Sequence, residues 1–196
     1  MADYTIISDV TNFLVSRLRK KMCPEPIPTE HSIESSSPSA QDVDYILGVY
    51  LFDIKQEGEI STPPMIKSGK TRLKKPPKPY TLYYMIFING SSQMGLKAPD
   101  IQKILGKVAQ VVADTETVSP REIQPWLDFA EPPIIFSAPK LTLEEKARIW
   151  QTINKPYQVS LFYKAAPVLI SSEIVAEASP VVEAEFNIRM EGEKDA

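Results

Sequence analysis

Six cations lie within twelve residues of the chain, a run called here the basic segment (residues 67–78). The chemistry that such a run favours is electrostatic binding to an anionic surface or to nucleic-acid phosphates. No aromatic residues alternate with these cations, which argues against base stacking. A solvated loop tip and an electrostatic contact with a protein partner are the alternatives. The six cations are Lys67, Lys70, Arg72, Lys74, Lys75 and Lys78.

Residues that could act as nucleophiles, general bases or metal ligands are few. The chain has one cysteine, Cys23, and one histidine, His31, both in a stretch rich in proline and serine. One of each cannot build a metal site, and a single cysteine forms no disulfide within the chain. No phosphate-binding loop, dinucleotide fingerprint or serine-nucleophile elbow occurs. We therefore expect a protein without enzymatic activity, without a cofactor and without a metal site.

Length and charge favour one folded domain. The 196 residues are 43% hydrophobic and 24% charged, which is ordinary for a globular protein. The net charge of −3 argues against wholesale nucleic-acid binding. At the N-terminus the acidic residues precede the basic ones, the reverse of a secretory signal, and no run of about 18 apolar residues marks a membrane span.

Apolar periodicity predicts the elements around the basic segment. Residues 4–21 repeat apolar residues at three- and four-residue spacing, which indicates an amphipathic helix. Residues 43–54 and 80–89 are nearly continuous apolar runs, typical of strands buried on both faces. Because consecutive strands usually pair, the long connection 55–79 is expected to join them as an extended hairpin. In the first strand, alternation predicts one face of Tyr45, Leu47, Val49 and Leu51 and another of Ile46, Tyr50, Phe52 and Ile54.

A second helix is expected to begin near Pro99, since proline at the first helical position costs no hydrogen bond. Gly106 in mid-helix costs about 1 kcal/mol against alanine, and a close approach by another element would explain it. Residues 113–133 lack a clear period, and Trp126 and Phe129 are the expected anchors of this irregular stretch. The apolar face of the helix is Ile101, Ile104, Leu105, Val108, Val111 and Val112.

A third helix is predicted by a capping box, in which Thr142 and Glu145 satisfy each other's backbone donors. A short strand at residues 134–137 precedes it, and a long strand at residues 157–171 follows it. Pro167 lacks a ladder donor, which predicts an edge, a bend or a bulge near the end of that strand. The helix is expected to run to about residue 153 and to bury Leu143, Ala147 and Trp150.

The C-terminal residues are acidic, with seven carboxylates and two cations from Glu173 onward. Residues 172–180 are expected to be a linker, and residues 181–190 alternate apolar and polar positions, which predicts an amphipathic strand. This arm either completes its own sheet or adds to the edge of a neighbouring subunit. Its apolar face is Val182, Ala184, Phe186, Ile188 and Met190.

These elements predict a single α/β domain over residues 1–172. Its mixed β-sheet of about four to five strands is flanked by three α-helices. An acidic linker and β-arm follow at residues 173–196.

The order of these segments resembles one family, the tail-terminator (cap) proteins of extracellular contractile injection systems, which are phage-tail-like particles. Each segment alone is mostly apolar core, but their order and spacing over residues 4–172 are fairly specific. The segments that carry the resemblance are residues 6–18, 45–54, 82–86, 96–110, and Trp150 followed by 155–172.

The resemblance implies a non-enzymatic structural protein that forms a hexameric ring and closes the end of the tube and sheath. Its implied partners are other copies of itself and the inner tube and sheath proteins. It also implies assembly in the cytoplasm and release as part of a particle. Some members carry a further C-terminal domain that this sequence does not show, so an adaptor beneath another cap component is one alternative. A nucleic-acid accessory protein that uses the basic segment and a small enzyme of unrecognised type are the other two.

Overall fold

The computed structural model forms two compact units. The main unit comprises Met1–Ser61 with Pro77–Ser171, and the small unit comprises Thr62–Pro76 with Ser172–Ala196. The structure describes residues 3–40, 44–58, 65–67, 72–90, 95–127 and 131–177.

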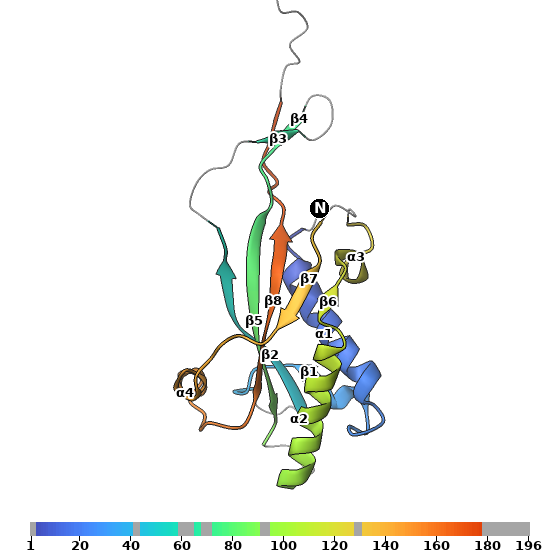
Figure 1. Cartoon of the computed structure of the whole chain (residues 1–196), viewed down its shortest axis with the longest axis vertical. Helices are drawn as coiled ribbons and strands as arrows, with labels where there is room; N and C mark the ends of the chain where they lie inside the picture. Colours follow the sequence, from blue (N-terminus) through green and yellow to red (C-terminus); the bar gives the residue numbers. More distant parts are fainter. Residues whose placement is uncertain are drawn as a thin grey trace, which may run out of the picture. The chain divides into compact units, whose positions relative to one another are not determined.

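The main unit is built on a mixed six-stranded sheet, with order β1-β2-β5-β8-β7-β6 (Figure 1). β1 is parallel to β2, and the other neighbours are antiparallel. The predicted single α/β domain is confirmed, and the expected hairpin is formed by β2 and β5. The strands are β1 (Ile33–Ser35), β2 (Leu47–Gln56), β5 (Lys78–Ile88), β6 (Thr117–Val118), β7 (Ile134–Ser137) and β8 (Leu161–Ile170).

Three substantial helices cover the two faces of this sheet. α1 (Ile6–Met22) and α2 (Ala98–Ala113) pack on one face, and α4 (Leu143–Thr152) lies on the other (Figure 1). α3 (Pro120–Ile123) and the 3-10 turn η1 (Glu30–Ser32) are short. The three predicted helices are therefore confirmed, each within about two residues of its expected start.

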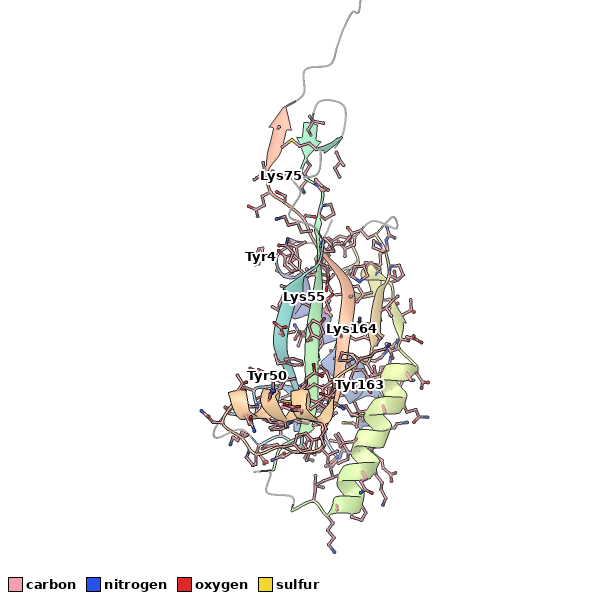
Figure 2. All side chains as sticks on the ribbon, turned by 60° about the vertical axis from the view of Figure 1, so that its left-hand side comes forward. Tyr4, Tyr50, Lys55, Lys75, Tyr163 and Lys164 are labelled. Carbon is pink, nitrogen blue, oxygen red and sulfur yellow. The ribbon has the colours of Figure 1, made fainter. Side chains whose placement is uncertain are left out.

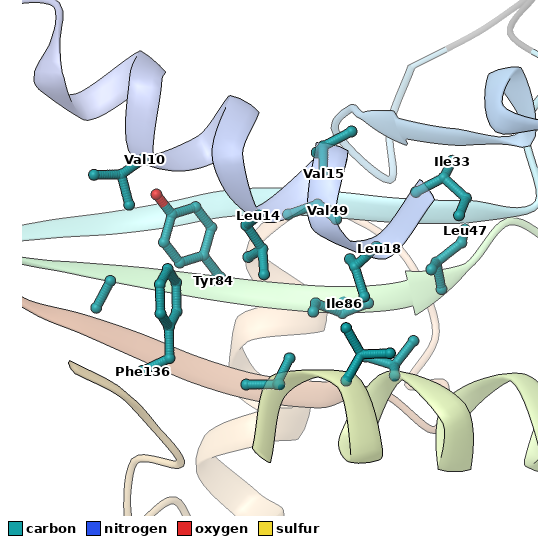
Figure 3. Close-up of a cluster of buried hydrophobic side chains, with 14 of the residues drawn as sticks. Val10, Leu14, Val15, Leu18, Ile33, Leu47, Val49, Tyr84, Ile86 and Phe136 are labelled. Atoms are coloured by element: carbon teal, nitrogen blue, oxygen red, sulfur yellow. The ribbon is translucent and has the colours of Figure 1, made fainter. Parts of the chain in front are cut away.

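The larger core lies between the sheet and helices α1 and α2. Leu14 and Leu18 of α1 face Tyr84 and Ile86 of β5, and all four are buried (Figure 3). The hydroxyls of Thr11 and Tyr84 are 3.0 Å apart within this apolar setting, so each polar group has a partner. Burial raises the pKa of Tyr84, which keeps its phenol protonated and able to donate that bond.

The smaller core lies under α4 and is aromatic. The Phe87 ring meets Trp150 edge-on at a centroid distance of 5.9 Å and Tyr45 at 6.2 Å. Trp150 also donates its indole N–H to Ser160 Oγ at 3.1 Å. Gly48 stands opposite Phe87 in the β2–β5 register, and a Cβ on Gly48 would lie 2.3 Å from the Phe87 ring. Glycine is therefore required there by the ring that lies across the strand.

β2 departs from the prediction at both ends. Ile46 joins the larger core and Tyr45 the smaller one, the reverse of the expected faces. The reason is that the strand begins only at Leu47, so these two residues do not follow its alternation. β1 pairs with β2 only as far as Val49, and the far half of β2 is exposed, including Ile54 and Lys55 (Figure 2). The expected interior position holds for β5 and for the first half of β2.

The predicted burial of two residues is wrong. Trp126 is 67% exposed, whereas its neighbour Leu127 is fully buried and anchors that stretch. Leu143 is also 67% exposed, because it is the first residue of α4, and Ile149 and Ile153 pack beside Trp150 instead. Ala147 is half-buried, and the other expected anchor, Phe129, lies outside the described residues.

Three smaller expectations have clear outcomes. The Thr142–Glu145 capping box is present, with Glu145 N–H donating to Thr142 Oγ1 at 3.2 Å. The ladder between β5 and β8 shifts register beside Pro167, which confirms a bulge. Among the described residues, no atom of another element lies within 4 Å of a Cβ added to Gly106, so the suggested close approach is not found there.

β1 was not expected, because it lies in the stretch of residues 22–42 that is rich in proline and serine. Arg19 of α1 donates from Nε and Nη2 to the Ile33 carbonyl at 2.9 and 2.7 Å. This charged fork fixes the start of β1 against the end of α1.

Candidate interaction surface

The basic segment folds in part as a hairpin. The expectation that it forms one structureless loop is therefore wrong. β3 (Ile66–Lys67) and β4 (Arg72–Lys74) pair antiparallel within the small unit, with Lys67 opposite Leu73. Lys75 follows β4 and is half-buried. Lys78 belongs to the main unit, as the exposed first residue of β5. Lys70 lies outside the described residues.

The expected linker at residues 172–180 contains a third strand, β9 (Val175–Glu177), and that part of the prediction is wrong. β9 pairs antiparallel with β4, so the small sheet has the order β3-β4-β9. The consecutive β-branched residues Ile174 and Val175 were the available signal. Three residues are too few for a period, so sequence analysis missed the strand.

The register of the small sheet joins two segments of opposite composition. Arg72 is the register partner of Glu177, and Leu73 is the partner of Ala176. The strand β4, from the basic segment, therefore pairs through its backbone with the acidic C-terminal part of the same chain.

The predicted arm lies outside the described residues, so its pairing stays a prediction. Its five apolar positions, like the domain boundary expected at residue 172, are not tested by the structure. The five are Val182, Ala184, Phe186, Ile188 and Met190.

The residues with reactive side chains do not gather into a reactive site in the described part of the chain. Burial raises the pKa of the Cys23 thiol, which disfavours the thiolate that nucleophilic chemistry needs. Within the described ranges, no three histidine, cysteine or carboxylate side chains are placed to hold a metal ion. No helix among these residues has the length and apolarity needed to cross a membrane.

The family model of the Pvc16 N-terminal domain matches residues 9–184, which is most of the chain. The chain belongs to the Pvc16 N-terminal domain family. The match spans the six-stranded sheet, its helices and the small sheet, so the membership covers both units. No curated protein sequence matches the chain.

Two solved structures resemble this Pvc16 N-terminal domain in fold. One is the sheath/tube terminator of PVC, an extracellular contractile injection system, in its extended state, with a TM-score of 0.65 and 19% identity. The other is the tube-terminating cap of the anti-feeding prophage, with a TM-score of 0.62 and 20% identity. They cover 98% and 92% of this chain, which spans 66% and 61% of their own lengths.

Proposed function

We propose that the chain is a structural cap, a tail-terminator protein that closes the end of the tube and sheath of a contractile injection system. The observation that carries the proposal is the family match over residues 9–184, the Pvc16 N-terminal domain. The fold of a PVC sheath/tube terminator over 98% of this chain supports it. The role is structural, and no catalytic step is assigned to any residue.

The cap acts as a closed ring, for which we propose six copies. A ring built from identical subunits uses heterologous interfaces that close on themselves. The proposed partners are the inner tube and the sheath at the end of the particle. The particle assembles in the cytoplasm and is released from the cell with the cap attached.

The basic segment is the proposed contact with acidic surface on the tube or sheath. Lys67, Arg72 and Lys74 belong to the paired strands β3 and β4. Each exposed ion pair contributes about 0.2–1 kcal/mol, so the contact depends on several of them acting together.

The test is assembly of particles in cells that lack this chain, with the wild type or a variant supplied. We expect wild type to give particles of uniform length with density for a ring of six copies at one end. The charge reversal K70E/R72E/K74E/K75E should leave the chain folded and reduce capping severalfold. Capped, uniform particles in the complete absence of the chain would contradict the cap function. A ring that sits beneath a further component would assign the adaptor role instead.

A further inference from the structure

We propose that the open end of β2 pairs with the same strand of a second copy of this chain. The two strands run antiparallel, with Ile54 on a two-fold axis and Asp53 of each copy opposite Lys55 of the other. Contacts of this kind are isologous, whereas the subunits of a closed ring meet through heterologous contacts. The proposal therefore describes the free chain and does not rest on the cap function.

One side of β2 lacks a strand partner over the second half of its length. Among the described residues, β1 is the strand on that side, and it pairs with β2 only as far as Val49 (Figure 1). Further along β2, Asp53 and Lys55 are exposed, and Ile54 is 44% exposed. An open edge of this kind offers main-chain donors and acceptors to a strand from another molecule.

The main-chain groups of Ile54 point toward this open side. Glu57 donates its N–H to the Pro79 carbonyl of β5 at 2.9 Å. Because successive residues of a strand point their main-chain groups to opposite sides, those of Asp53 and Lys55 also face β5, and those of Ile54 face away. The Ile54 N–H donates instead to the Asp53 carboxylate, at 2.9 Å. Two copies of Ile54 placed opposite each other can exchange both N–H···O bonds of an antiparallel pair.

The side chains around Ile54 favour pairing with a second copy in this register. Asp53 and Lys55 are two residues apart in the strand, so they lie on the same face of the sheet. Ile54 lies on the opposite face, where its β5 partner Leu82 is buried in the larger core. Antiparallel pairing centred on Ile54 therefore places two opposite-charge pairs on one face and two isoleucines on the other. Both kinds of pair are stabilising directly across an antiparallel ladder.

Charges on an edge strand usually prevent pairing with another copy, because like charges then meet and repel. The edge of β2 differs, since the charges on the two sides of Ile54 have opposite signs and exchange places in an antiparallel copy. The bulge between Leu51 and Asp53 limits the ladder to the few residues that follow it. We expect a weak dimer that dissociates on dilution, because a contact this short buries little surface.

The test is complementation between two charge reversals, measured by sedimentation velocity on the full chain. D53K places two lysines beside Ile54 and K55E places two carboxylates there, so each variant alone brings like charges together across the axis. We expect each variant to dimerise at least about fivefold more weakly than wild type. An equimolar mixture of the two should form a heterodimer of wild-type affinity, and the double variant D53K/K55E should recover the homodimer. Raised salt should reduce these differences, because exposed charges are screened.

A matched control uses Asp100 and Lys103 of α2, an exposed ion pair within one copy at 3.8 Å. D100K and K103E should associate as wild type does, both alone and mixed. Thermal unfolding checks that every variant is folded, as the exposure of both β2 positions leads us to expect. A wild type that stays monomeric at high concentration would overturn the proposal. Self-association that D53K leaves unchanged, or a mixture that associates no more strongly than its components, would overturn it too.

Discussion

At the scale of single residues, Gly48 has the least room for a side chain among the glycines in the described part of the chain. A Cβ there would meet the Phe87 ring at 2.3 Å, and Trp150 and Tyr45 hold that ring edge-on. We expect Gly48→Ala to lower the free energy of unfolding by about 1–3 kcal/mol, because the ring must leave a packed position. Urea unfolding followed by tryptophan fluorescence measures this. An unchanged midpoint would show that the aromatic core repacks at no cost.

Gly106 is the comparison for Gly48, because alanine at Gly106 is expected to raise the free energy of unfolding. It lies in α2 with open space around its missing side chain, so alanine adds no clash. Gly106→Ala should raise the free energy of unfolding by about 0.5–1 kcal/mol through helix propensity alone. The same urea experiment applies to both variants. A destabilised Gly106→Ala would contradict this expectation.

Among the elements, α4 depends on its cap. Hydrogen bonds from the Thr142 backbone and hydroxyl to the carboxylate lower the pKa of Glu145 below its usual range. A carboxyl with a depressed folded pKa adds stability that is fully present above its unfolded pKa, about 4.3, and is lost as pH falls through the folded value.

Thr142→Ala should therefore lower stability near neutral pH by about 1 kcal/mol and flatten its decline at acidic pH. Thermal unfolding between pH 7 and pH 3 provides the measurement, with Thr152→Ala as the control. Thr152 donates its hydroxyl to the Arg148 carbonyl at the other end of α4 and leaves the cap intact. Parallel pH curves for wild type and Thr142→Ala would refute the role of the cap.

The elements that sequence analysis found are the long ones with a period. α1 repeats its apolar residues at helical spacing and β5 is a long, nearly continuous apolar run, and the burial of each follows its pattern. β1, β6 and β9 have two or three residues each, which is too short for any period, and neighbouring strands rather than their own sequence define them. Residue identity alone also misplaces burial, as Trp126 shows, because an apolar side chain is buried only where its backbone position faces the core.

Sequence analysis could predict the charges of the candidate site but not which strands pair there. The basic segment is evident from its composition, and so is the acidic C-terminus. Their contact through β4 and β9 joins residues about 100 positions apart, and no local pattern signals it. β5 and β8 are neighbours in the main sheet, so the two segments that continue from their ends begin at adjacent positions.

At the scale of the whole molecule, the two units should differ in local stability. The small sheet has short strands, whereas β5 pairs along nearly its whole length and is buried in the main core. Local opening is easiest where few buried apolar contacts must break. We expect the amides of Arg72–Lys74 to exchange with solvent deuterium at least tenfold faster than those of Tyr84 and Ile86. Equal protection would show that the two units open together.

The order of synthesis determines when the two central strands of the main sheet, β5 and β8, can pair. Leu161 of β8 follows its partner Ile86 of β5 by 75 residues, with α2, β7 and α4 between them. At ~5–20 residues per second, a ribosome needs roughly 4–15 s to make that stretch. During this interval the nascent chain carries β5 paired to β2 on one side and open on the other. A hydrophobic strand edge is a template for wrong pairing, so we expect the nascent chain to be most prone to aggregation in the interval before β8 is made.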